Sequence, residues 1–565
     1  MRKTTLFISC LLIAISDVFG QNIYPQDYFN PPLKTPIVLA GTFGELRSSH
    51  FHSGIDFKTQ NKQGLPVHTA AEGYVSRIKV SLFGYGKAIY VTHPNGYTTV
   101  YAHMQNFNKK IDSFLKKKQY LNESYEIQIF PKKDLLSVDK NEVIGYSGNT
   151  GSSSAPHLHF EIRDTETEKI INPMLFGLHP SDHKKPIISG LRAMVLNDSS
   201  QVNSSSLAIP LKLKEKEKGN YYCSTIHAYG TIGFSIHTFD QQDAAFNKNG
   251  VYKIEMRVNG KTFYAHKMET FSFAESKFIN LLIDYPYHYH HKKKYQKTYL
   301  HPKSNLSIYE ITNEKGLLLI EDGISYAVEI IVSDFAGNIS NIKIPIQGKK
   351  TTPRIIRAPK TTDHLIRVDS KYKLKTKEVE ILFPKNSCYD DFYLHFEKED
   401  DKFKIHEPSV PMKRDFEIRF NIQNLPDSIR KKTYIAEVVK DKYFNYCTTK
   451  KTDSIFSTET KQLGTYQLYQ DWKGPNIYNC NFYHNQNIKK FKFLSICSID
   501  KLSGIKSYRG EIDGEWILME YNPKTHTFTY NLSDKMLTTG KHSFTFVTED
   551  NVGNTSFYSA LFYTN

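Results

Sequence analysis

Several residue types and motifs are scarce or missing in this sequence. Of its 565 residues, only 2 are Trp, 9 are Met and 6 are Cys. No C-x-x-C pair occurs, which argues against zinc or redox chemistry based on cysteine. After the first twenty residues, no stretch approaches the ~20 apolar residues that a membrane-spanning helix needs. The sequence therefore predicts a chain without a membrane span and without thiol chemistry.

Three familiar catalytic motifs are also missing. The one His-Glu pair, His406-Glu407, continues with Pro-Ser-Val and so does not form the H-E-x-x-H helix of thermolysin-like proteases. No G-x-S-x-G turn is present to carry a serine nucleophile. Gly86-Lys87 lacks the upstream glycine of a phosphate-binding loop. These absences exclude the common signatures of three enzyme classes.

The charge is basic but dispersed. The chain has 74 Lys and Arg against 58 Asp and Glu, a formal net charge of +16. The basic residues occur in short groups such as Lys116–Lys118 and Lys292–Lys294, without a long basic tract or zinc-finger spacing. We therefore expect no nucleic-acid partner. The charge suits contact with anionic polymers such as cell wall or lipid headgroups.

The abundant residues point to strands. The chain contains 37 Tyr and 36 Phe, and aromatic residues favour pleated, half-buried strands over helices. At roughly 150 residues per domain, the length predicts about three or four domains. We therefore expect an all-β dominated chain of several domains.

The first twenty residues resemble an export signal. Arg2 and Lys3 precede an apolar stretch from Leu6 to Ile15, and Gly20 is a small residue before Gln21. We predict a signal peptide over residues 1–20, with Cys10 removed inside it. The mature protein is then expected to be exported and soluble, either periplasmic or secreted.

Export leaves five cysteines, an odd number in an oxidising compartment. Two pairings are local in sequence and stand as hypotheses: Cys480 with Cys497, and Cys388 with Cys447. The odd number implies at least one unpaired thiol or an intermolecular bridge.

Two parts of the chain echo each other. Ile331–Ser340 and Val547–Ser556 both contain Asp, then a Gly-Asn turn, between candidate strands. Each is preceded by a related hairpin, Gly250–Gly260 and Gly504–Gly514, with an Asn-Gly or Asp-Gly turn. We predict duplicated immunoglobulin-like β-sandwiches at 186–348 and 461–565, separated by a β-rich module at 349–460.

The first of these modules has a longer connection between its two echoes. That insertion contains Asp284-Tyr-Pro-Tyr-His-Tyr-His-His291. His288-Tyr-His-His291 could bind a metal, but we interpret it as an exposed loop.

Helices are expected to be few. The best candidate is Phe107–Tyr120, where Phe107, Ile111, Phe114 and Leu115 fall on one face and lysines on the other. It lies inside the first domain and could form a rim of a cleft there.

Histidines form the sharpest constellation in the chain. In His157-Leu-His-Phe-Glu-Ile-Arg163, polar and apolar residues alternate as in a half-buried strand. His157, His159 and Glu161 therefore share one face, and the apolar residues between them face the core. His52 and Asp56 are four apart with Gly54 between them, which also suits one face of an extended segment.

These residue types suit zinc. Zinc accepts imidazole nitrogen and carboxylate oxygen, and three protein ligands with one open position make a catalytic site. His52, Asp56 and one histidine of the pair supply such a set. His103 lies on a hairpin around Pro94-Asn-Gly96, where it is predicted to share a face with Thr99 and Tyr101. A histidine beside a metal can serve as general base or electrostatic stabiliser.

In order and content, these motifs resemble the lysostaphin-type (LytM-like) zinc endopeptidases of peptidoglycan. The resemblance runs from about Gly41 to Phe176, through Phe43-Gly-Glu-Leu-Arg47, His52-Ser-Gly-Ile-Asp-Phe57, Gly64-Leu-Pro-Val67, Ala70-Ala-Glu-Gly-Tyr-Val75, Gly84-Tyr-Gly86, Tyr101-Ala-His-Met104, Gly145-Tyr-Ser-Gly-Asn-Thr-Gly151, His157-Leu-His-Phe-Glu-Ile-Arg163 and Asn172-Pro173. It implies a compact antiparallel β peptidase domain at 21–185. It also implies one Zn²⁺ per chain held by His52, Asp56 and His159, with His103 and His157 as the catalytic pair. The order of the roles of that pair stays open.

The expected function follows from the resemblance. It is hydrolysis of peptide cross-links in bacterial peptidoglycan, with the C-terminal sandwiches placing the enzyme on the wall or on an envelope protein partner. The alternative is a non-catalytic wall-binding or amidase-activating scaffold that keeps the fold. The stretch between Met104 and Val143 looks longer than usual for the family and could reshape the cleft.

Overall fold

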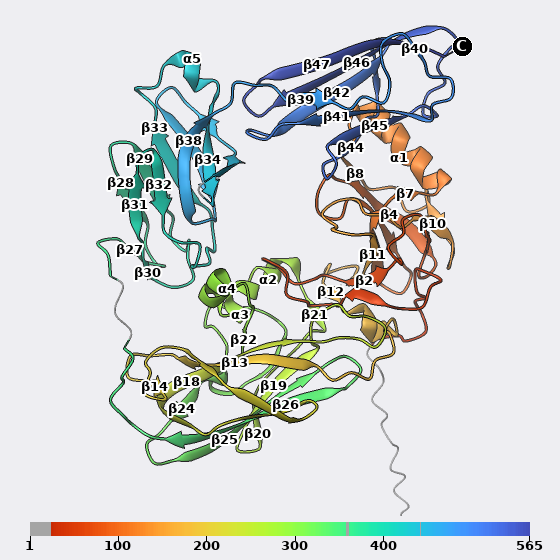
Figure 1. Cartoon of the computed structure of the whole chain (residues 1–565). Coiled ribbons are helices and arrows are strands. Elements are labelled where there is room, and N and C mark those ends of the chain that lie inside the picture. Colours follow the sequence, from red (N-terminus) through yellow and green to blue (C-terminus); the bar gives the residue numbers. More distant parts are fainter. Residues whose placement is uncertain (1–23, 357–360, 441, 565) are drawn as a thin grey trace, which may run out of the picture.

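The computed structural model describes residues 24–356, 361–440 and 442–564. The predicted signal peptide at 1–20, Cys10 included, lies outside the described residues. Strands dominate the chain, as expected. We divide it into a first module (24–185), a second (186–356), a third (361–470) and a fourth (471–564), which Figure 1 shows arranged as a ring.

The first module is built on a large antiparallel sheet in the order β1-β2-β11-β6-β5-β4-β8, with a smaller sheet β3-β10-β7 beside it. Its central strand β11 pairs with β2 on one side and β6 on the other. The elements are β1 (Leu39–Gly41), β2 (Ile55–Lys58), β3 (Pro66–His68), β4 (Gly73–Val80), β5 (Lys87–Thr92), β6 (Tyr97–Met104), β7 (Asn106–Phe107), α1 (Lys109–Asn122), β8 (Ile127–Ile129), β9 (Ser137–Val138), β10 (Val143–Tyr146), β11 (His157–Asp164), β12 (Ile170–Ile171) and η1 (Pro173–Phe176).

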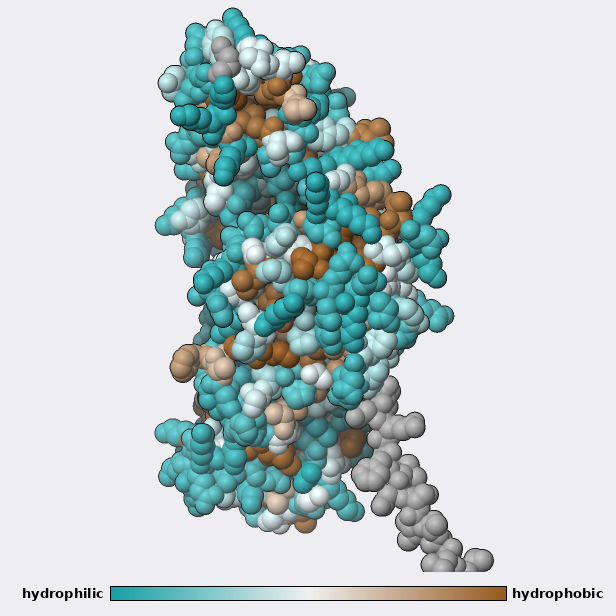
Figure 2. All heavy atoms as spheres, turned by 90° about the vertical axis from the view of Figure 1, so that its right-hand side faces the viewer, coloured by the Kyte–Doolittle hydropathy of each residue, from teal (hydrophilic) through white to brown (hydrophobic). Residues whose placement is uncertain are grey.

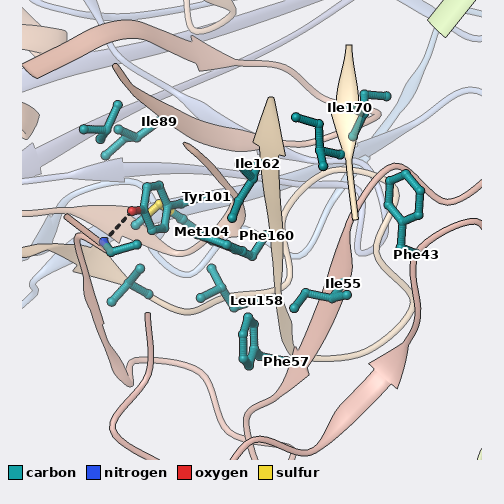
Figure 3. Packing of buried hydrophobic residues seen from close by; sticks show 14 of the residues in the cluster. Phe43, Ile55, Phe57, Ile89, Tyr101, Met104, Leu158, Phe160, Ile162 and Ile170 are labelled. Carbon is teal, nitrogen blue, oxygen red and sulfur yellow. Dashed lines mark hydrogen bonds between the residues drawn. The ribbon is translucent and has the colours of Figure 1, made fainter. Parts of the chain in front are cut away.

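The alternation predicted for β11 is confirmed. Leu158, Phe160 and Ile162 are fully buried in one core, where they pack beside Ile55 and Tyr101 (Figure 3). Because neighbours in a strand point to opposite faces, His157, His159 and Glu161 lie on the other face of the sheet. The core thus fixes the register that brings the polar residues together.

The second module carries most of its strands in one extended set of β ladders. Its elements are β13 (Ile187–Val195), β14 (Gln201–Val202), β15 (Ile209–Leu211), β16 (Leu213–Glu217), β17 (Asn220–Cys223), β18 (Ile226–Phe239), β19 (Lys253–Val258), β20 (Lys261–Lys267), β21 (Thr270–Phe271), α2 (Phe273–Ser276), α3 (Ile279–Leu282), α4 (Tyr285–His291), β22 (Gln296–Lys297), β23 (Tyr309–Thr312), η2 (Asn313–Gly316), β24 (Leu318–Ile320), β25 (Ser325–Ser333) and β26 (Ile339–Gly348). The expected insertion forms α2, α3 and α4. The prediction that the histidine tract 288–291 is a loop is wrong, because these residues end the helix α4. Strand β21 pairs with β12 of the first module, so one sheet crosses the boundary.

The third module contains two five-stranded sheets, β28-β29-β33-β37-β36 and β31-β32-β38-β34-β35. Its last strand ends at Gln470 rather than near residue 460, because β38 pairs with β34 and completes the second sheet. The elements are β27 (Leu365–Ile366), β28 (Tyr372–Lys375), β29 (Val379–Phe383), β30 (Phe392–Tyr393), β31 (Phe396–Glu399), β32 (Lys402–Ile405), β33 (Phe416–Asn421), α5 (Asp427–Arg430), β34 (Thr433–Val439), β35 (Tyr443–Cys447), β36 (Lys450–Lys451), β37 (Ile455–Thr460) and β38 (Gly464–Gln470).

The fourth module packs the sheet β39-β41-β45-β44 against the sheet β40-β47-β46-β42-β43. Its strands are β39 (Asn476–Tyr478), β40 (Gln486–Asn487), β41 (Phe493–Ile499), β42 (Ile505–Ile512), β43 (Glu515–Ile517), β44 (Glu520–Asn522), β45 (Thr527–Asn531), β46 (Lys541–Asp550) and β47 (Thr555–Tyr563).

The predicted echo between the second and fourth modules is visible in their hairpins. Asn259-Gly260 joins β19 to β20, and Asp513-Gly514 joins β42 to β43. All four turn residues have positive φ, between 49° and 83°, as a two-residue hairpin turn of this kind requires. Both sequence signals therefore correspond to the same local structure.

The predicted helix forms as α1, but it starts two residues later than expected because Phe107 belongs to β7. Asn108 begins the helix by accepting a hydrogen bond from the Ile111 amide. Ile111 and Leu115 are buried in the first module. One of the helix lysines, Lys116, reaches the fourth module and pairs with Asp534 at 2.7 Å. The helix thus contributes to the closure of the ring.

The two hypothetical disulfides are wrong: all five described cysteines are free thiols. Cys497 lies on β41 with its sulfur 3.5 Å from the Thr527 hydroxyl, which belongs to the neighbouring strand β45. The backbone of Cys388 forms an isolated antiparallel β-bridge with that of Met412, and Cys388 is buried in the third module. Cys447 is the last residue of the edge strand β35. These strand positions direct the sulfurs toward other partners.

Among the described residues, no helix is long and apolar enough to span a bilayer. The face that carries α1 is mainly hydrophilic, with small and separate apolar patches (Figure 2).

Candidate metal centre

The register between β2 and β11 assembles the centre of the site. His159 lies directly opposite Asp56 in this antiparallel pair. Cross-strand neighbours of this kind place their side chains on the same face. His52, four residues before Asp56, reaches the same point from the segment that leads into β2. The local fold therefore brings together two segments about a hundred residues apart in the chain.

Three side chains converge there as the sequence predicts. Ligand atoms of His52, Asp56 and His159 lie within 4.8 Å of one another, and all three residues are buried. Asp56 Oδ1 is 3.0 Å from His52 Nε2 and 2.9 Å from His159 Nδ1. The two imidazole nitrogens are themselves 3.0 Å apart. The group thus offers two nitrogens and one carboxylate oxygen at one point.

Hydrogen bonds from behind orient both rings. His52 Nδ1 lies 2.8 Å from the Thr42 carbonyl oxygen, so it carries the proton and leaves Nε2 bare. His159 Nε2 lies 2.9 Å from Glu161 Oε1 and donates to it, so Nδ1 is the nitrogen that faces Asp56. A bare nitrogen fixed by a hydrogen bond on the opposite side of the ring is the arrangement typical of metal-bound histidine.

His103 and His157 stand beside this group. Their ring centroids are 4.8 Å apart, and that of His103 is 5.8 Å from His159. His103 Nδ1 donates to the Thr150 carbonyl at 2.9 Å, and His157 Nδ1 donates to the Ala155 carbonyl at 2.8 Å. In each ring Nε2 is therefore the other nitrogen, and that of His157 lies 3.4 Å from Asp56 Oδ1. All five histidine and aspartate positions predicted for the site lie together.

His103 reaches this place by breaking the strand alternation. The prediction that it shares a face with Thr99 and Tyr101 is wrong, because those two residues lie in the core while His103 contacts the histidines of β11. Its backbone has φ of 59°, a left-handed conformation that costs about 1–3 kcal/mol for a residue with a side chain. That conformation at the end of β6 turns the ring to the other face.

The glycine-rich turn before β11 packs closely against His103. A Cβ atom on Gly148 would come within 2.7 Å of the His103 carbonyl oxygen. The turn can approach this closely because Gly148 has no side chain. The same turn supplies Thr150, whose carbonyl accepts the hydrogen bond from His103. The Gly145–Gly151 motif thus positions a site residue.

Glu161 is a functional position that we did not predict. It is fully buried behind His159 and accepts hydrogen bonds from Ser53 at 2.6 Å, from Tyr85, and from Arg163 Nε at 2.7 Å. Tyr85 also stacks on the His159 ring at 5.3 Å between centroids. The signal was its place two residues after His159 on the polar face of β11.

Neighbouring histidines and Arg163 stabilise the negative charges of Asp56 and Glu161. Burial alone would raise the pKa of Asp56, but the surrounding histidines hold it well below its usual range. Burial also opposes ionisation of Glu161, yet the charge of Arg163 and the hydrogen bond from His159 keep the pKa of Glu161 low. Both side chains are therefore carboxylates.

The pKa values of the His159 and His103 rings are shifted in opposite directions. Burial would lower the pKa of His159, but hydrogen bonds to Asp56 and Glu161 raise it to about 9. Burial and the neighbouring histidines lower the pKa of His103 to about 3, which keeps that ring neutral. Asp56 and Glu161 thus require positive charge between them, and either a proton on His159 or a metal cation would supply it.

Arg47 holds the second oxygen of Asp56. Its Nη2 lies 3.1 Å from Asp56 Oδ2 and 3.3 Å from Glu45 Oε2. Because Oδ2 is occupied in this way, Oδ1 is the oxygen directed at His52 and His159. Sequence reasoning placed Arg47 in a motif without giving it this contact.

The donor set fits a zinc ion. Two bare imidazole nitrogens and one carboxylate oxygen are the ligands of a catalytic zinc site, and Glu161 and Thr42 supply the outer hydrogen bonds that such ligands need. The histidine tract of the insertion does not take part: His288, His290 and His291 lie on α4, and His290 is 3.7 Å from Glu407 of the third module.

Two family models match parts of the chain. Residues 50–129 match the model of peptidase family M23, and residues 363–471 match that of a Zu5-like domain. The second match lies almost entirely within the third module.

Named relatives match about a fifth to a quarter of the chain. The DD-carboxypeptidase/endopeptidase Mpg of Neisseria gonorrhoeae is 33% identical over 118 residues, which cover 21% of this chain and 21% of that protein. An uncharacterized metalloprotease of Haemophilus influenzae is 31% identical over 150 residues, covering 26% of this chain and 24% of that protein. The cell division protein DipM of Caulobacter vibrioides is 26% identical over 138 residues, covering 24% and 18%. The match spans about a fifth of the length of these curated relatives.

Solved structures give matches of the same extent. The catalytic domain of lysostaphin from Staphylococcus simulans is 23% identical, and the alignment covers 25% of this chain and 93% of that one with a TM-score of 0.19. The catalytic domain of the prophage-encoded M23 protein EnpA from Enterococcus faecalis is 22% identical, covering 26% and 98% with a TM-score of 0.20.

Proposed function

We propose that the first module of this chain is a peptidase of family M23, and that the protein is a zinc-dependent endopeptidase that hydrolyses peptide cross-links of bacterial peptidoglycan. One observation carries the proposal: His52, Asp56 and His159 offer three ligand atoms within 4.8 Å, and two further histidine rings face the same point. A histidine with a purely structural role would not require four histidines and an aspartate from three separate segments to meet at one point.

In this proposal His52, Asp56 and His159 hold one Zn²⁺ per chain. The ion supplies Lewis acidity to the attacking water and to the scissile carbonyl. The chain's own residues then manage the protons. His103 donates from Nδ1 to Thr150 and stays neutral, so its Nε2 can accept a hydrogen bond from the attacking water and take its proton.

His157 takes the complementary role. Its side chain is 15% exposed, against 4% for His159, so it is the ring with access to solvent protons. With Nδ1 bound to the Ala155 carbonyl, a proton on Nε2 points into the site and can stabilise the oxygen of the scissile carbonyl. Tyr85, Ser53 and Arg163 act indirectly by holding Glu161, which orients His159.

Substrate and location extend the same proposal. One matched relative is named a DD-carboxypeptidase/endopeptidase, which supports a peptide of the bacterial wall as the substrate. The apolar segment after Arg2 and Lys3 and the basic balance of the chain support export to a periplasmic or external site. The immunoglobulin-like second and fourth modules and the third module would position the enzyme on the wall or on an envelope protein.

Zinc analysis combined with digestion of purified muropeptides tests the function. We expect about one zinc per chain in the wild type. His52→Ala should lose both zinc and cleavage, because it removes a ligand. His157→Ala should keep zinc and lose cleavage by about 10²–10⁴-fold, the range for a removed acid–base group. His288→Ala, on α4, is the matched histidine control and should change neither.

Unaltered cleavage in both site variants would discard the mechanism. Binding of muropeptides without cleavage by the zinc-loaded wild type would favour the non-catalytic wall-binding or amidase-activating scaffold instead.

A further inference from the structure

A second cluster of ligand-type residues lies at the junction of the first and second modules. Carboxylate oxygens of Asp182, Asp240 and Asp334 all lie within 4.8 Å of one another. Asp182 is on the segment that leads into β13, Asp240 follows β18, and Asp334 follows β25. Three separate segments, one from the first module and two from the second, therefore direct carboxylates to one point.

Two buried oxygens in this place have no partner. Oδ1 of Asp240 and Oε1 of Gln242 accept no hydrogen bond from the described residues. The two side chains belong to residues only 3% and 5% exposed. Both line a cavity of about 20 Å³ together with Asp182. A buried oxygen without a donor costs free energy unless a ligand satisfies it, and this cavity has room for about one small ion or water.

The charge of the cluster calls for a dication. The Lys184 ammonium lies near the three carboxylates, and its Nζ donates to the carbonyls of Gln242 at 2.9 Å and Asp243 at 3.3 Å. Asp243 is a fourth carboxylate beside Asp182 and is paired with His183 at 2.7 Å. The three carboxylates of the cluster and Lys184 alone sum formally to −2. Burial and the other two carboxylates raise the pKa of Asp240 to about 7, which is the response of an acid that lacks a counter-charge.

The ligand atoms distinguish this cluster from the candidate zinc site. Carboxylate and amide oxygens are hard ligands that suit calcium, whereas zinc prefers the imidazole nitrogens found around Asp56. The three carboxylate oxygens lie within 4.8 Å of one another, close enough to share one ion. Magnesium usually keeps several of its waters, and a cavity with room for about one small ion or water does not hold them.

We propose that Asp182, Asp240, Asp334 and Gln242 form a calcium site that braces the junction between the first and second modules. The proposal stands independently of the peptidase activity.

The braced segment leads directly to the candidate metal centre. Asp240 and Asn249 pair through two backbone hydrogen bonds of 3.0 and 2.8 Å. The next residue, Gly250, donates to the Thr42 hydroxyl at 3.0 Å, and the Thr42 carbonyl accepts from His52. Calcium bound at Asp240 would therefore stiffen the support of His52 without touching the reacting atoms.

The fourth module contains the duplicate of this cluster and serves as an internal control. Asp471, Asp500 and Asp550 occupy the corresponding positions. The equivalence extends to single bonds: Asn338 Nδ2 donates to the Asp182 carbonyl, and Asn554 Nδ2 donates to the Asp471 carbonyl, both at 3.1 Å.

One difference separates the two copies. In the fourth module Asp471 Oδ2 accepts from the Ser503 amide and hydroxyl, and Asp500 Oδ1 accepts from the Leu502 and Gly504 amides. None of these three aspartates has a buried side-chain oxygen without a partner among the described residues. The chain's own donors thus satisfy the oxygens that are left free in the second module.

Calorimetric titration of the zinc-loaded full chain with calcium tests the proposal. We expect Asp240→Asn to weaken calcium binding by at least about tenfold, because ligand charge sets affinity in such sites. Asp500→Asn, the matched change in the duplicate, should leave that binding unchanged. Calcium should also raise the melting temperature of the wild type and of Asp500→Asn, but not that of Asp240→Asn.

Gln242→Leu provides a second variant that removes one neutral oxygen and no charge. It should also weaken calcium binding, so the test remains decisive if Asp240→Asn fails to fold. Absence of calcium binding by the wild type would overturn the proposal, as would unchanged binding by both variants. Equal affinity for magnesium would overturn the assignment to calcium.

Discussion

The first module makes two junctions within the ring, and they are built differently. Toward the second module, β12 pairs with β21, and Met268, Phe271 and Ile279 join the buried core of the first module. Toward the fourth module, three ion pairs surround a smaller apolar contact of Trp516 and Leu518: Lys87 with Glu520, Lys116 with Asp534, and Arg509 with Glu123.

The two junctions differ in how easily the modules on either side can separate. A continuous core and a shared sheet behave as a single folding unit, because separating them would expose apolar side chains and unpaired strand edges. A junction dominated by ion pairs loses little on exposure to water, since charged groups are well solvated there. We infer that the first and second modules are inseparable, whereas the fourth can be detached from α1.

The largest expected effect breaks the apolar junction. Phe271 is fully buried, with its ring 4.8 Å from that of Phe43 and 5.3 Å from that of Phe51. Phe271→Ala should lower the free energy of unfolding by about 3–5 kcal/mol, through lost burial and the cavity left behind. Because Phe51 precedes His52, zinc affinity should fall as well. Urea denaturation and zinc titration measure the two effects.

Phe557→Ala is the control for this change, since that ring is 77% exposed in the fourth module. It should shift the free energy of unfolding by no more than about 0.5 kcal/mol. Equal destabilisation by the two substitutions would contradict a core shared between the modules.

A smaller effect is expected where the second junction is most buried. Lys87 has a side chain only 9% exposed, and its Nζ lies 2.8 Å from Glu520, which is 42% exposed. Glu520→Gln should lower the free energy of unfolding by about 1–3 kcal/mol, because it leaves the buried Lys87 ammonium without its counter-charge. This is less than the ~3–5 kcal/mol expected for a fully buried pair, since Glu520 is partly exposed. Lys87→Met should cost less, since Glu520 can then turn to water.

The rate of amide hydrogen exchange in α1 compares the two variants, Glu520→Gln and Lys87→Met. Faster exchange of the α1 amides in Glu520→Gln than in Lys87→Met is the expected order. The reverse order would mean that the carboxylate, not the ammonium, is the residue that depends on its partner.

Local patterns predicted the centre of the site but not its support. The alternation in β11 and the spacing of His52 and Asp56 were enough to predict that His52, Asp56 and one histidine of β11 meet, because a strand with one buried face has a fixed register. The choice of His159 came from the family resemblance. Tyr85 and Arg47 were missed as contacts since nothing in their spacing relates them to Glu161 or Asp56. His103 was assigned to the wrong face because one left-handed residue reverses the alternation.

Long-range assembly was beyond sequence patterns for a similar reason. The duplicated Asn-Gly and Asp-Gly hairpins were found from short local signals, and their turns form as predicted. The return of the fourth module onto α1 depends on pairs such as Lys116 with Asp534, which are more than four hundred residues apart. Single lysines and aspartates on exposed faces carry no signal of their partner. The same holds for the thiols, whose spacing suggested disulfides, whereas all five described cysteines are free.

The smallest expected effect sharpens the comparison at the outer edge of the second junction. Arg509 and Glu123 lie 2.6 Å apart, but their side chains are 47% and 50% exposed. A double-mutant cycle with Arg509→Gln and Glu123→Gln should give a coupling of only about 0.2–1 kcal/mol. That coupling should fall toward zero at ~1 M salt, where screening acts within about 3 Å. The Lys87–Glu520 pair, being better shielded, should keep most of its coupling in the same salt. If both couplings vanish together, the junction is a uniform ionic surface, and the buried lysine does not act as its anchor.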